Sequence, residues 1–425
     1  MEAFDLVIRN VRLNNEVVNI AISNGKIIKI AKEIHEKGIE EINANGGLAL
    51  PPFFNMHFHL DSALTMGDPR LNESGTLWEG IEIWAERKKK LTIDDILKRA
   101  EVIVKWSVTH GVLWLRSHAD ITEKSLTALK GELMAKEKFK DLMNIQVTAF
   151  PQDGILTDPG NAELLEKAME LGADNVGMIP HNEWTREDAV KSIKIAFDIA
   201  IKYNKDVDGH VDETDDSQSR YLEVVAAETI RRNWIGRVTA GHVTASHSWD
   251  PAYRFRITPL IKRAGITIIA NPLINIHLQG RFDTALKRRG MAPIKYFLDH
   301  GVNVALGHDC VLDPWYPLGV GNMLHALFMA IHVDHDFLGR DLERSLDLIT
   351  YNAAKAWHII DQYGVREGNP ANLLIFKEKS ILDIIRLMDK PLYVIKDGKV
   401  IAKNTYESQI NIDGKWEEVS FDFMK

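Results

Sequence analysis

Two histidines, His57 and His59, stand at the end of an apolar run early in the chain. Residues two apart on a strand share a face, so both imidazoles can bind one metal ion at about 2.1 Å. His210 and Asp309 end two later apolar runs. Three neutral imidazoles and one carboxylate suit zinc or iron(II) and leave room for a water, whose pKa the metal lowers toward about 7. These residues predict one divalent metal ion per subunit, Fe²⁺ or Zn²⁺, and hydrolytic chemistry.

Glu213 follows His210 by three residues, just beyond the same apolar run. A carboxylate at that distance can take a proton from a water and return it to a nitrogen of the substrate. The alternative is a solvated loop acid, since Asp212, Asp215 and Asp216 occur in the same stretch. We expect Glu213 to be the proton carrier because it lies so close to a predicted metal ligand.

The elements that must position these residues are apolar, β-branched runs that alternate with amphipathic helical stretches. This alternation is typical of parallel strands buried on both faces. After a long first gap, the runs recur at about the length of one βαβ unit. Eight units predict a (β/α)8 TIM-type barrel, an α/β fold whose sites lie at the carboxyl ends of the strands. The predicted strands are 53–59, 112–118, 145–151, 175–181, 207–212, 237–242, 267–271 and 303–309.

Polar residues stand at or near the end of every predicted strand, which packing alone does not require. The alternative, a set of histidines that only pack in the core, explains one or two such positions but not all of them. Since these ends converge on one face of a barrel, we expect one shared site there. The residues are His57, His59, His118, Gln152, His181, His210, His242, Asn271 and Asp309.

Both ends of the chain are strand-like. Segments 4–11, 16–23 and 26–30 precede the barrel, and 371–376, 392–396 and 399–402 follow it. Asn24-Gly25 and Asp397-Gly398 are hairpin turn signals. We predict a small β-sandwich module formed by residues 1–50 plus 367–425, and a catalytic barrel at 51–366. Two unrelated β-extensions are the alternative.

Composition excludes several classes of function. The 425 residues carry a net charge of -8 and no stripe of Lys and Arg, which argues against a nucleic-acid surface. Cys310 is the one cysteine, which excludes an intrachain disulfide and the zinc deaminase design with two cysteine ligands. The N-terminus shows no leader pattern, and no apolar run reaches about 18 residues. We therefore expect a cytoplasmic protein that does not bind membranes.

Longer motifs carry a family resemblance. His57-Phe58-His59, His210, His242 and Asp309 resemble the amidohydrolase superfamily pattern. Segments 74–81 (SGTLWEGI), 150–156 (FPQDGIL), 275–284 (NIHLQGRFDT) and 313–319 (DPWYPLG) resemble the bacterial cytosine deaminase family over nearly the whole chain. The resemblance implies that the four predicted ligands hold one metal, that Glu213 shuttles protons, and that His242 orients and polarises the attacking water.

The same resemblance implies a pocket for a base. Gln152 would bind the amide edge of a pyrimidine, and the Leu77 carbonyl would accept a ring N–H. Phe150 and Trp315 would form the walls. One position departs from the family pattern, which has two consecutive aspartates here: Cys310 stands where the second is expected. A thiol behaves as a small hydrophobe, so Cys310 is expected to admit a substituent on the base, such as a 5-methyl group.

The implied activity is hydrolytic deamination of cytosine and/or 5-methylcytosine to uracil or thymine plus ammonia, as in pyrimidine salvage. The partner would be a small-molecule pyrimidine base, and the family tends to form homo-oligomers. Alternatives are an amidohydrolase acting on isoguanine, creatinine or an aminotriazine, a ring-opening cyclic amidase, and a metal-holding scaffold without turnover. The predicted fourth strand ends in His181 rather than lysine, which favours one metal and counts against ring opening.

Overall fold

A computed structural model of the chain describes residues 3–288 and 290–419. The chain divides into two compact units: Met1–Pro52, Val108–Gly111 and Ile359–Lys425 form one, and Phe53–Ser107 and Val112–His358 form the other. The predicted domain boundaries at residues 50, 51, 366 and 367 stay a prediction. Residues 1–2 and 420–425 of the predicted module lie outside the described part.

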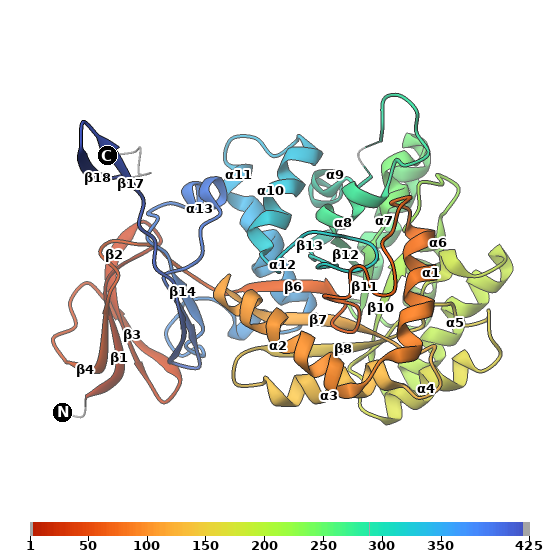
Figure 1. Ribbon diagram of the computed structural model, residues 1–425, viewed down its shortest axis with the longest axis horizontal. Coiled ribbons are helices and arrows are strands. Elements are labelled where there is room, and N and C mark those ends of the chain that lie inside the picture. The colour runs from red at the N-terminus through yellow and green to blue at the C-terminus, as the bar shows by residue number, and fades with distance from the viewer. Residues whose placement is uncertain (1–2, 289, 420–425) are drawn as a thin grey trace. The chain divides into compact units, whose positions relative to one another are not determined.

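In the larger unit, the described residues form an eight-stranded parallel sheet whose strands follow chain order from β6 to β13. The sheet nearly closes on itself, because the Asp309 N–H donates to the His57 carbonyl at 2.8 Å and Phe58 pairs with Asp309 in a parallel bridge. The predicted (β/α)8 barrel is confirmed (Figure 1). The strands are β6 Phe53–Phe58, β7 Val112–Asp120, β8 Asn144–Phe150, β9 Asn175–Val176, β10 Asp206–Val211, β11 Val238–His242, β12 Thr267–Ala270 and β13 Asn303–Leu306.

The fourth barrel strand is shorter than predicted. The run 175–181 was expected to be one strand, but β9 ends at Val176 and His181 lies on the 3-10 helix η2 (Pro180–Asn182). The backbone still follows its neighbour for two residues, since the His210 N–H donates to the Met178 carbonyl at 2.9 Å. Pro180 has no N–H to continue the ladder and starts η2 instead.

Two other strand ends differ from the prediction. The strand β7 continues to Asp120, so His118 lies inside it rather than at its end. The strand β13 ends at Leu306, and Asp309 follows in a left-handed conformation with φ of 63°. Asp309 still reaches the strand ends because it pairs with Phe58 where the first and last strands of the barrel meet, which we call the seam.

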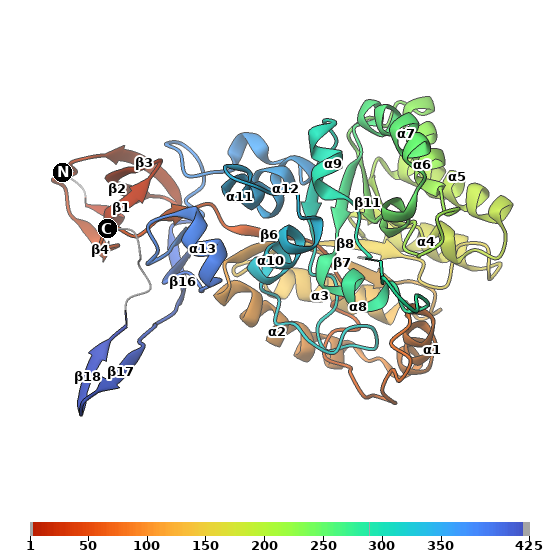
Figure 2. The same ribbon diagram turned by 90° about the horizontal axis from the view of Figure 1, so that it is seen from above.

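Helices lie outside these strands in both views of the barrel (Figures 1 and 2). Threonines cap two of them: the Thr92 hydroxyl accepts from the Asp95 N–H at 3.1 Å, and the Thr185 hydroxyl accepts from the Asp188 N–H at 3.1 Å. The helices are α1 Leu77–Arg87, α2 Ile93–Thr109, α3 Thr127–Lys138, α4 Asn161–Glu170, α5 Arg186–Tyr203, α6 Tyr221–Arg231, α7 Pro251–Ala264, α8 Pro272–Leu278, α9 Ile294–Asp299, α10 Met323–Asp334, α11 Asp341–Arg344 and α12 Tyr351–Ala356.

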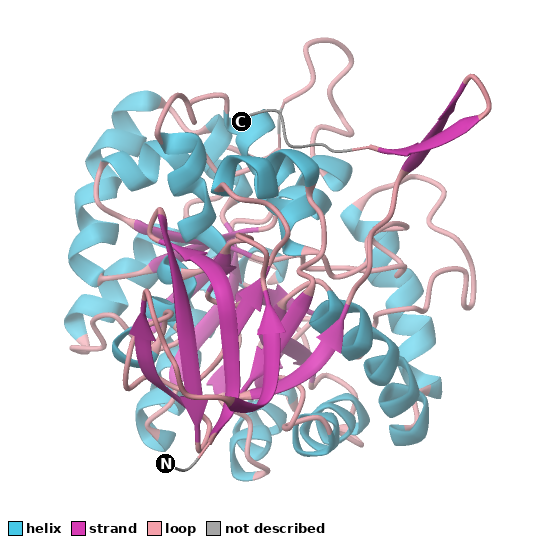
Figure 3. Ribbon diagram, turned by 90° about the vertical axis from the view of Figure 1, so that its left-hand side faces the viewer, coloured by secondary structure: helices cyan, strands magenta, loops and turns pink. Residues whose placement is uncertain are grey.

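The smaller unit contains, among its described residues, two four-stranded sheets with the orders β3-β2-β1-β4 and β16-β15-β14-β5 (Figure 3). Leu6 and Ile20 from the N-terminal strands share one core with Leu373 and Ile395 from the C-terminal strands. Both ends of the chain therefore build the predicted small β-module, and they are not unrelated extensions. Its elements are β1 Phe4–Leu13, β2 Glu16–Ser23, β3 Lys26–Ala31, β4 Gly38–Asn43, β5 Ala49–Leu50, β14 Leu373–Ile375, α13 Ile381–Leu387, β15 Tyr393–Lys396 and β16 Lys399–Lys403.

A separate hairpin of β17 (Gln409–Ile412) and β18 (Lys415–Glu418) follows these sheets and was not predicted. Among the described residues, no helix has both the length and the apolar character that crossing a membrane requires.

Candidate active site

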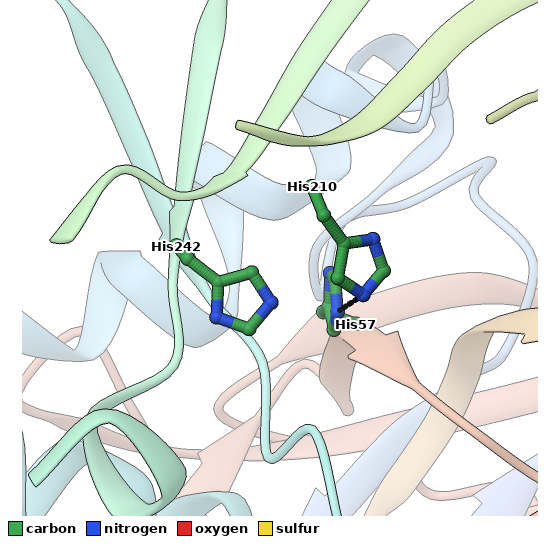
Figure 4. Close-up of side chains that lie close together, drawn as sticks. All are labelled: His57, His210 and His242. Carbon is green, nitrogen blue, oxygen red and sulfur yellow. Dashed lines mark hydrogen bonds between the residues drawn. The ribbon is translucent and has the colours of Figure 1, made fainter. Parts of the chain in front are cut away.

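Three histidines and one aspartate from distant parts of the chain converge inside the barrel. The Nε2 atom of His210 lies 3.1 Å from Nε2 of His57 and 3.2 Å from Nε2 of His59. Asp309 Oδ1 lies 3.7 Å and 3.5 Å from the same atoms of His57 and His59. All four side chains are buried. The structure thus brings together the four residues that the sequence predicts as ligands, two of which Figure 4 shows.

The chemistry of this cluster fits a divalent metal ion. Burial and neighbouring imidazoles lower the pKa of His57 and His210 well below the ordinary value, so both rings are neutral and offer lone pairs. Nδ1 of each ring is buried without a hydrogen-bond partner, and each Nε2 faces another electron-pair donor. Buried lone pairs that face one another repel, and a cation bound between them removes that repulsion.

The surrounding backbone orients the imidazoles. His59 Nδ1 lies 3.1 Å from the His118 carbonyl, which fixes the proton on Nδ1 and turns the Nε2 lone pair toward the cluster. The His57 ring packs against Gly241 on β11, where an added Cβ would approach the ring to 2.9 Å. Only glycine leaves room for the ring at that position.

A second group of titratable side chains adjoins the cluster. Glu213 Oε1 lies 3.3 Å from His242 Nδ1, and His242 Nε2 lies 3.7 Å from Asp309 Oδ2. Glu213 is only 3% exposed, so it is not a solvated loop acid. Burial and the nearby Asp309 raise the pKa of Glu213 well above its ordinary value. His242 also lies close enough to His57 and His210 for one ligand atom of each to fall within 4.8 Å (Figure 4).

A cavity of about 340 Å³, its open mouth included, lies directly over these groups. Four of the five residues predicted to bind substrate line this cavity: Leu77, Gln152, Cys310 and Trp315. The Trp315 indole N–H donates to the Leu77 carbonyl at 3.2 Å, which ties two walls together. The complete lining is His59, Leu77, Gln152, Ile179, His210, Glu213, His242, Ile274, Leu278, Asp309, Cys310 and Trp315.

Phe150 is the predicted wall residue that does not line the cavity. Its ring stacks on the His210 imidazole with centroids 3.9 Å apart and an interplanar angle of 16°. It therefore supports His210 from behind rather than forming the surface that faces the cavity.

Several residues of the site were not assigned a role from the sequence. Ile179, Ile274 and Leu278 supply apolar lining, and nothing in an apolar side chain distinguishes it from the core. His118 was noted only as polar; its Nε2 lies 3.0 Å from Asp208 Oδ2. The position of Asp208, two residues before His210 on the same face of β10, is a signal that could have found this pair.

Comparison with known proteins agrees with this geometry. A family model described as "Amidohydrolase family" matches residues 40–402. The crystal structure of 5-methylcytosine deaminase from Klebsiella pneumoniae liganded with 5-fluorocytosine is 41% identical, covers 96% of this chain and 100% of that chain, and has a TM-score of 0.93. A second structure of that name, liganded with phosphonocytosine, is 40% identical with a TM-score of 0.91 and covers 96% of this chain and 100% of that chain.

A curated relative, N-isopropylammelide isopropyl amidohydrolase of Pseudomonas sp. (strain ADP), is 30% identical over 410 residues, which are 94% of this chain and 98% of that protein. The family match, these relatives and the buried histidine cluster in a nearly closed barrel lead to one conclusion. The chain belongs to the amidohydrolase family of hydrolases.

Proposed function

We propose that this protein is a metal-dependent deaminase of cytosine-type free bases, which converts cytosine or 5-methylcytosine and water into uracil or thymine and ammonia. One observation carries the proposal: Gln152, Glu213 and Cys310 line the same small cavity, directly over the histidine cluster. An amide, a carboxyl group with a raised pKa and a buried thiol are complementary to the amide edge, the ring nitrogen and the 5-methyl group of such a base. The likeness to 5-methylcytosine deaminase supports the choice of substrate.

His57, His59, His210 and Asp309 would hold the divalent metal, Fe²⁺ or Zn²⁺. When bound, such a cation supplies the Lewis acidity that lets a water lose its proton near neutral pH. Asp309 faces both the cluster and His242, so it would also help to align the attacking water with the base.

Glu213 would carry the proton. Its raised pKa suits a group that takes a proton from the attacking water and delivers it to the adjacent ring nitrogen. Glu213 would later carry the second proton of that water to the departing amino group. The C–N bond to the exocyclic nitrogen breaks, ammonia leaves and the oxygen of water stays on the ring. His242, 3.7 Å from Asp309 Oδ2, would orient and polarise the water.

The base would be recognised by hydrogen bonds at its edge. Gln152 can donate and accept at once, so it would read the ring amide, and bases with another pattern would leave its buried groups unpaired. The Leu77 carbonyl already accepts from Trp315 but has a second lone pair for a ring N–H. Trp315 would form a wall, and Phe150 would act through its stacking on His210.

The test is a screen for ammonia release with identification of the product by mass. The metal-loaded protein is incubated with cytosine, 5-methylcytosine, isoguanine, creatinine and aminotriazines. We expect turnover of cytosine or 5-methylcytosine with the ring intact. A ring-opened acid, or turnover confined to the other compounds, would contradict the proposal.

An aminotriazine is the second candidate substrate, because the relative N-isopropylammelide isopropyl amidohydrolase is 30% identical over nearly the full length. That enzyme's name describes loss of an alkylamino group. The same screen separates the candidates, since an alkylamino-triazine would release an alkylamine rather than ammonia. Assembly into a homo-oligomer stays a prediction, which sedimentation of the purified protein tests.

A further inference from the structure

Two amide side chains contact the ring nitrogens of His242. Asn275 Nδ2 lies 2.9 Å from His242 Nδ1, whereas Asn271 Nδ2 lies 3.2 Å from Nδ1 and 3.4 Å from Nε2. All three residues are almost completely buried. The two asparagines are four residues apart at the start of α8, where the Asn275 N–H donates to the Asn271 carbonyl at 3.0 Å. This first turn of the helix presents both amides on one face, toward the ring.

We propose that Asn275 fixes the tautomer of His242, with Nδ1 free of a proton and Nε2 protonated. An amide NH2 group can only donate, and a neutral imidazole has one donor and one acceptor nitrogen. If Nδ1 carried a proton, its N–H would face the Asn275 NH2 group, a second donor, at 2.9 Å. The contact therefore requires a bare Nδ1, and the ring carries its proton on Nε2, the nitrogen that lies 3.7 Å from Asp309 Oδ2.

This tautomer assigns separate tasks to His242 and Glu213. Glu213 Oε1 also lies 3.3 Å from Nδ1. Glu213 would exchange protons with the ring if the lone pair of that nitrogen were not already hydrogen-bonded. The Asn275 N–H occupies the lone pair, so Glu213 carries protons alone and His242 acts only as a fixed N–H donor. A protonated Nε2 also has no lone pair for a metal, which keeps His242 out of the ligand set.

The direct test is ¹⁵N NMR of the full-length, zinc-loaded protein with labelled histidines. Protonated and bare ring nitrogens give well-separated signals, and His242 is assigned by its disappearance in His242→Asn. We expect a bare Nδ1 and a protonated Nε2. The opposite pattern would mean that the amide oxygen of Asn275 faces the ring, and it would overturn the proposal.

Variants at Asn275 link the tautomer to turnover, and this part rests on the proposed function. Asn275→Asp keeps the shape but can only accept, so it forces the proton onto Nδ1. In the serine protease triad, holding the histidine in the wrong tautomer lowers kcat roughly 10⁴-fold. We expect kcat to fall at least about 100-fold here. Metal content should remain one per chain, and the NMR signals of His242 should exchange.

The matched control is Asn322→Asp, another buried asparagine, which caps α10 through the Leu324 N–H and lies outside the cavity lining. Aspartate caps helices equally well, so activity should stay within about twofold. An Asn275→Asp variant with wild-type kcat would overturn the proposal. If the wild type turns over none of the bases, the proposed function fails, while the NMR result still decides the tautomer.

Discussion

Glu213 and Asp309 are two carboxyl groups buried in one cavity wall, and burial raises the pKa of both well above their ordinary values. A cation held by Asp309 reverses that effect for its own ligand, because a bound ion is the largest local charge. Glu213 would then be the carboxyl group left to hold a proton near neutral pH. Their different surroundings would separate the two proposed roles, as they do in other enzymes with paired carboxyl groups.

Replacing Glu213 tests this division of roles. Glu213→Gln is nearly isosteric but cannot move a proton, so we expect kcat to fall by about 10² to 10⁴-fold with the metal retained. Turnover of the base and metal content per chain are the measurements. A fall of less than about tenfold would place the proton carrier elsewhere.

Cys310 is expected to set the preference between cytosine and 5-methylcytosine. The thiol is 3% exposed and lines the cavity, and burial raises its pKa, so it is uncharged. Burying one methyl group stabilises a complex by roughly 1 kcal/mol, and an apolar pocket discriminates one methylene by about 10 to 200-fold. We expect Cys310→Asp to shift the ratio of kcat/KM toward cytosine. An unchanged ratio would show that Cys310 only packs in the wall.

At the scale of the element, helix α1 supplies Leu77 to the wall of the cavity. It begins at Leu77, whose carbonyl accepts from Trp315, and its residue Gly80 packs under the same indole. Lys88, directly after the helix, forms ion pairs with Asp120 at 3.1 Å and Asp153 at 2.5 Å. These pairs join α1 to the ends of two barrel strands, so a displacement of α1 changes the cavity.

A substitution inside α1 tests this. In Gly80→Ala the added Cβ would lie 2.2 Å from Trp315 Cδ1, so the ring or the helix must move. We expect kcat/KM to fall at least about tenfold, although alanine favours a helix by about 1 kcal/mol. Gly131→Ala is the control, since the nearest atom to its Cβ would be Ile96 Cδ1, 2.7 Å away, and Ile96 is not part of the cavity lining. Equal losses in both variants would contradict the role of α1.

The elements also show what could be predicted from the sequence. Barrel strands and the convergence of His57, His210 and Asp309 follow from periodicity and from the rule that strand ends meet on one face. The end of β9 could not be predicted so well, because the chain stays apolar from Val176, where the strand ends, through Pro180. The contact of Asn275 with His242 could not be predicted, because it depends on where a short helix begins.

At the scale of the whole molecule, a metal held by the predicted ligands would join the first, fifth and eighth strands of the barrel. A ligand that binds only the folded state stabilises it by about 2.7 kcal/mol at 100 times its Kd. We therefore expect removal of the metal by a chelator to lower Tm by several degrees and to abolish activity. His210→Ala should match the chelated protein and not respond to added metal.

The matched control is His332→Ala, at an exposed histidine on α10. It should keep the metal, the activity and the sensitivity of Tm to the chelator. A His210→Ala protein with one metal per chain and full turnover would remove His210 from the site.

The seam of the barrel has a consequence for biosynthesis. The His308 N–H donates to Asn55 Oδ1, 253 positions earlier in the chain, beside the contact between His57 and Asp309. At about 5 to 20 residues per second, a ribosome makes β6 roughly 10 to 50 s before its partner across the seam emerges. During that time one edge of β6 is unpaired and Asp309 has not been made. The complete metal site therefore cannot form until the ribosome has made the chain as far as Asp309.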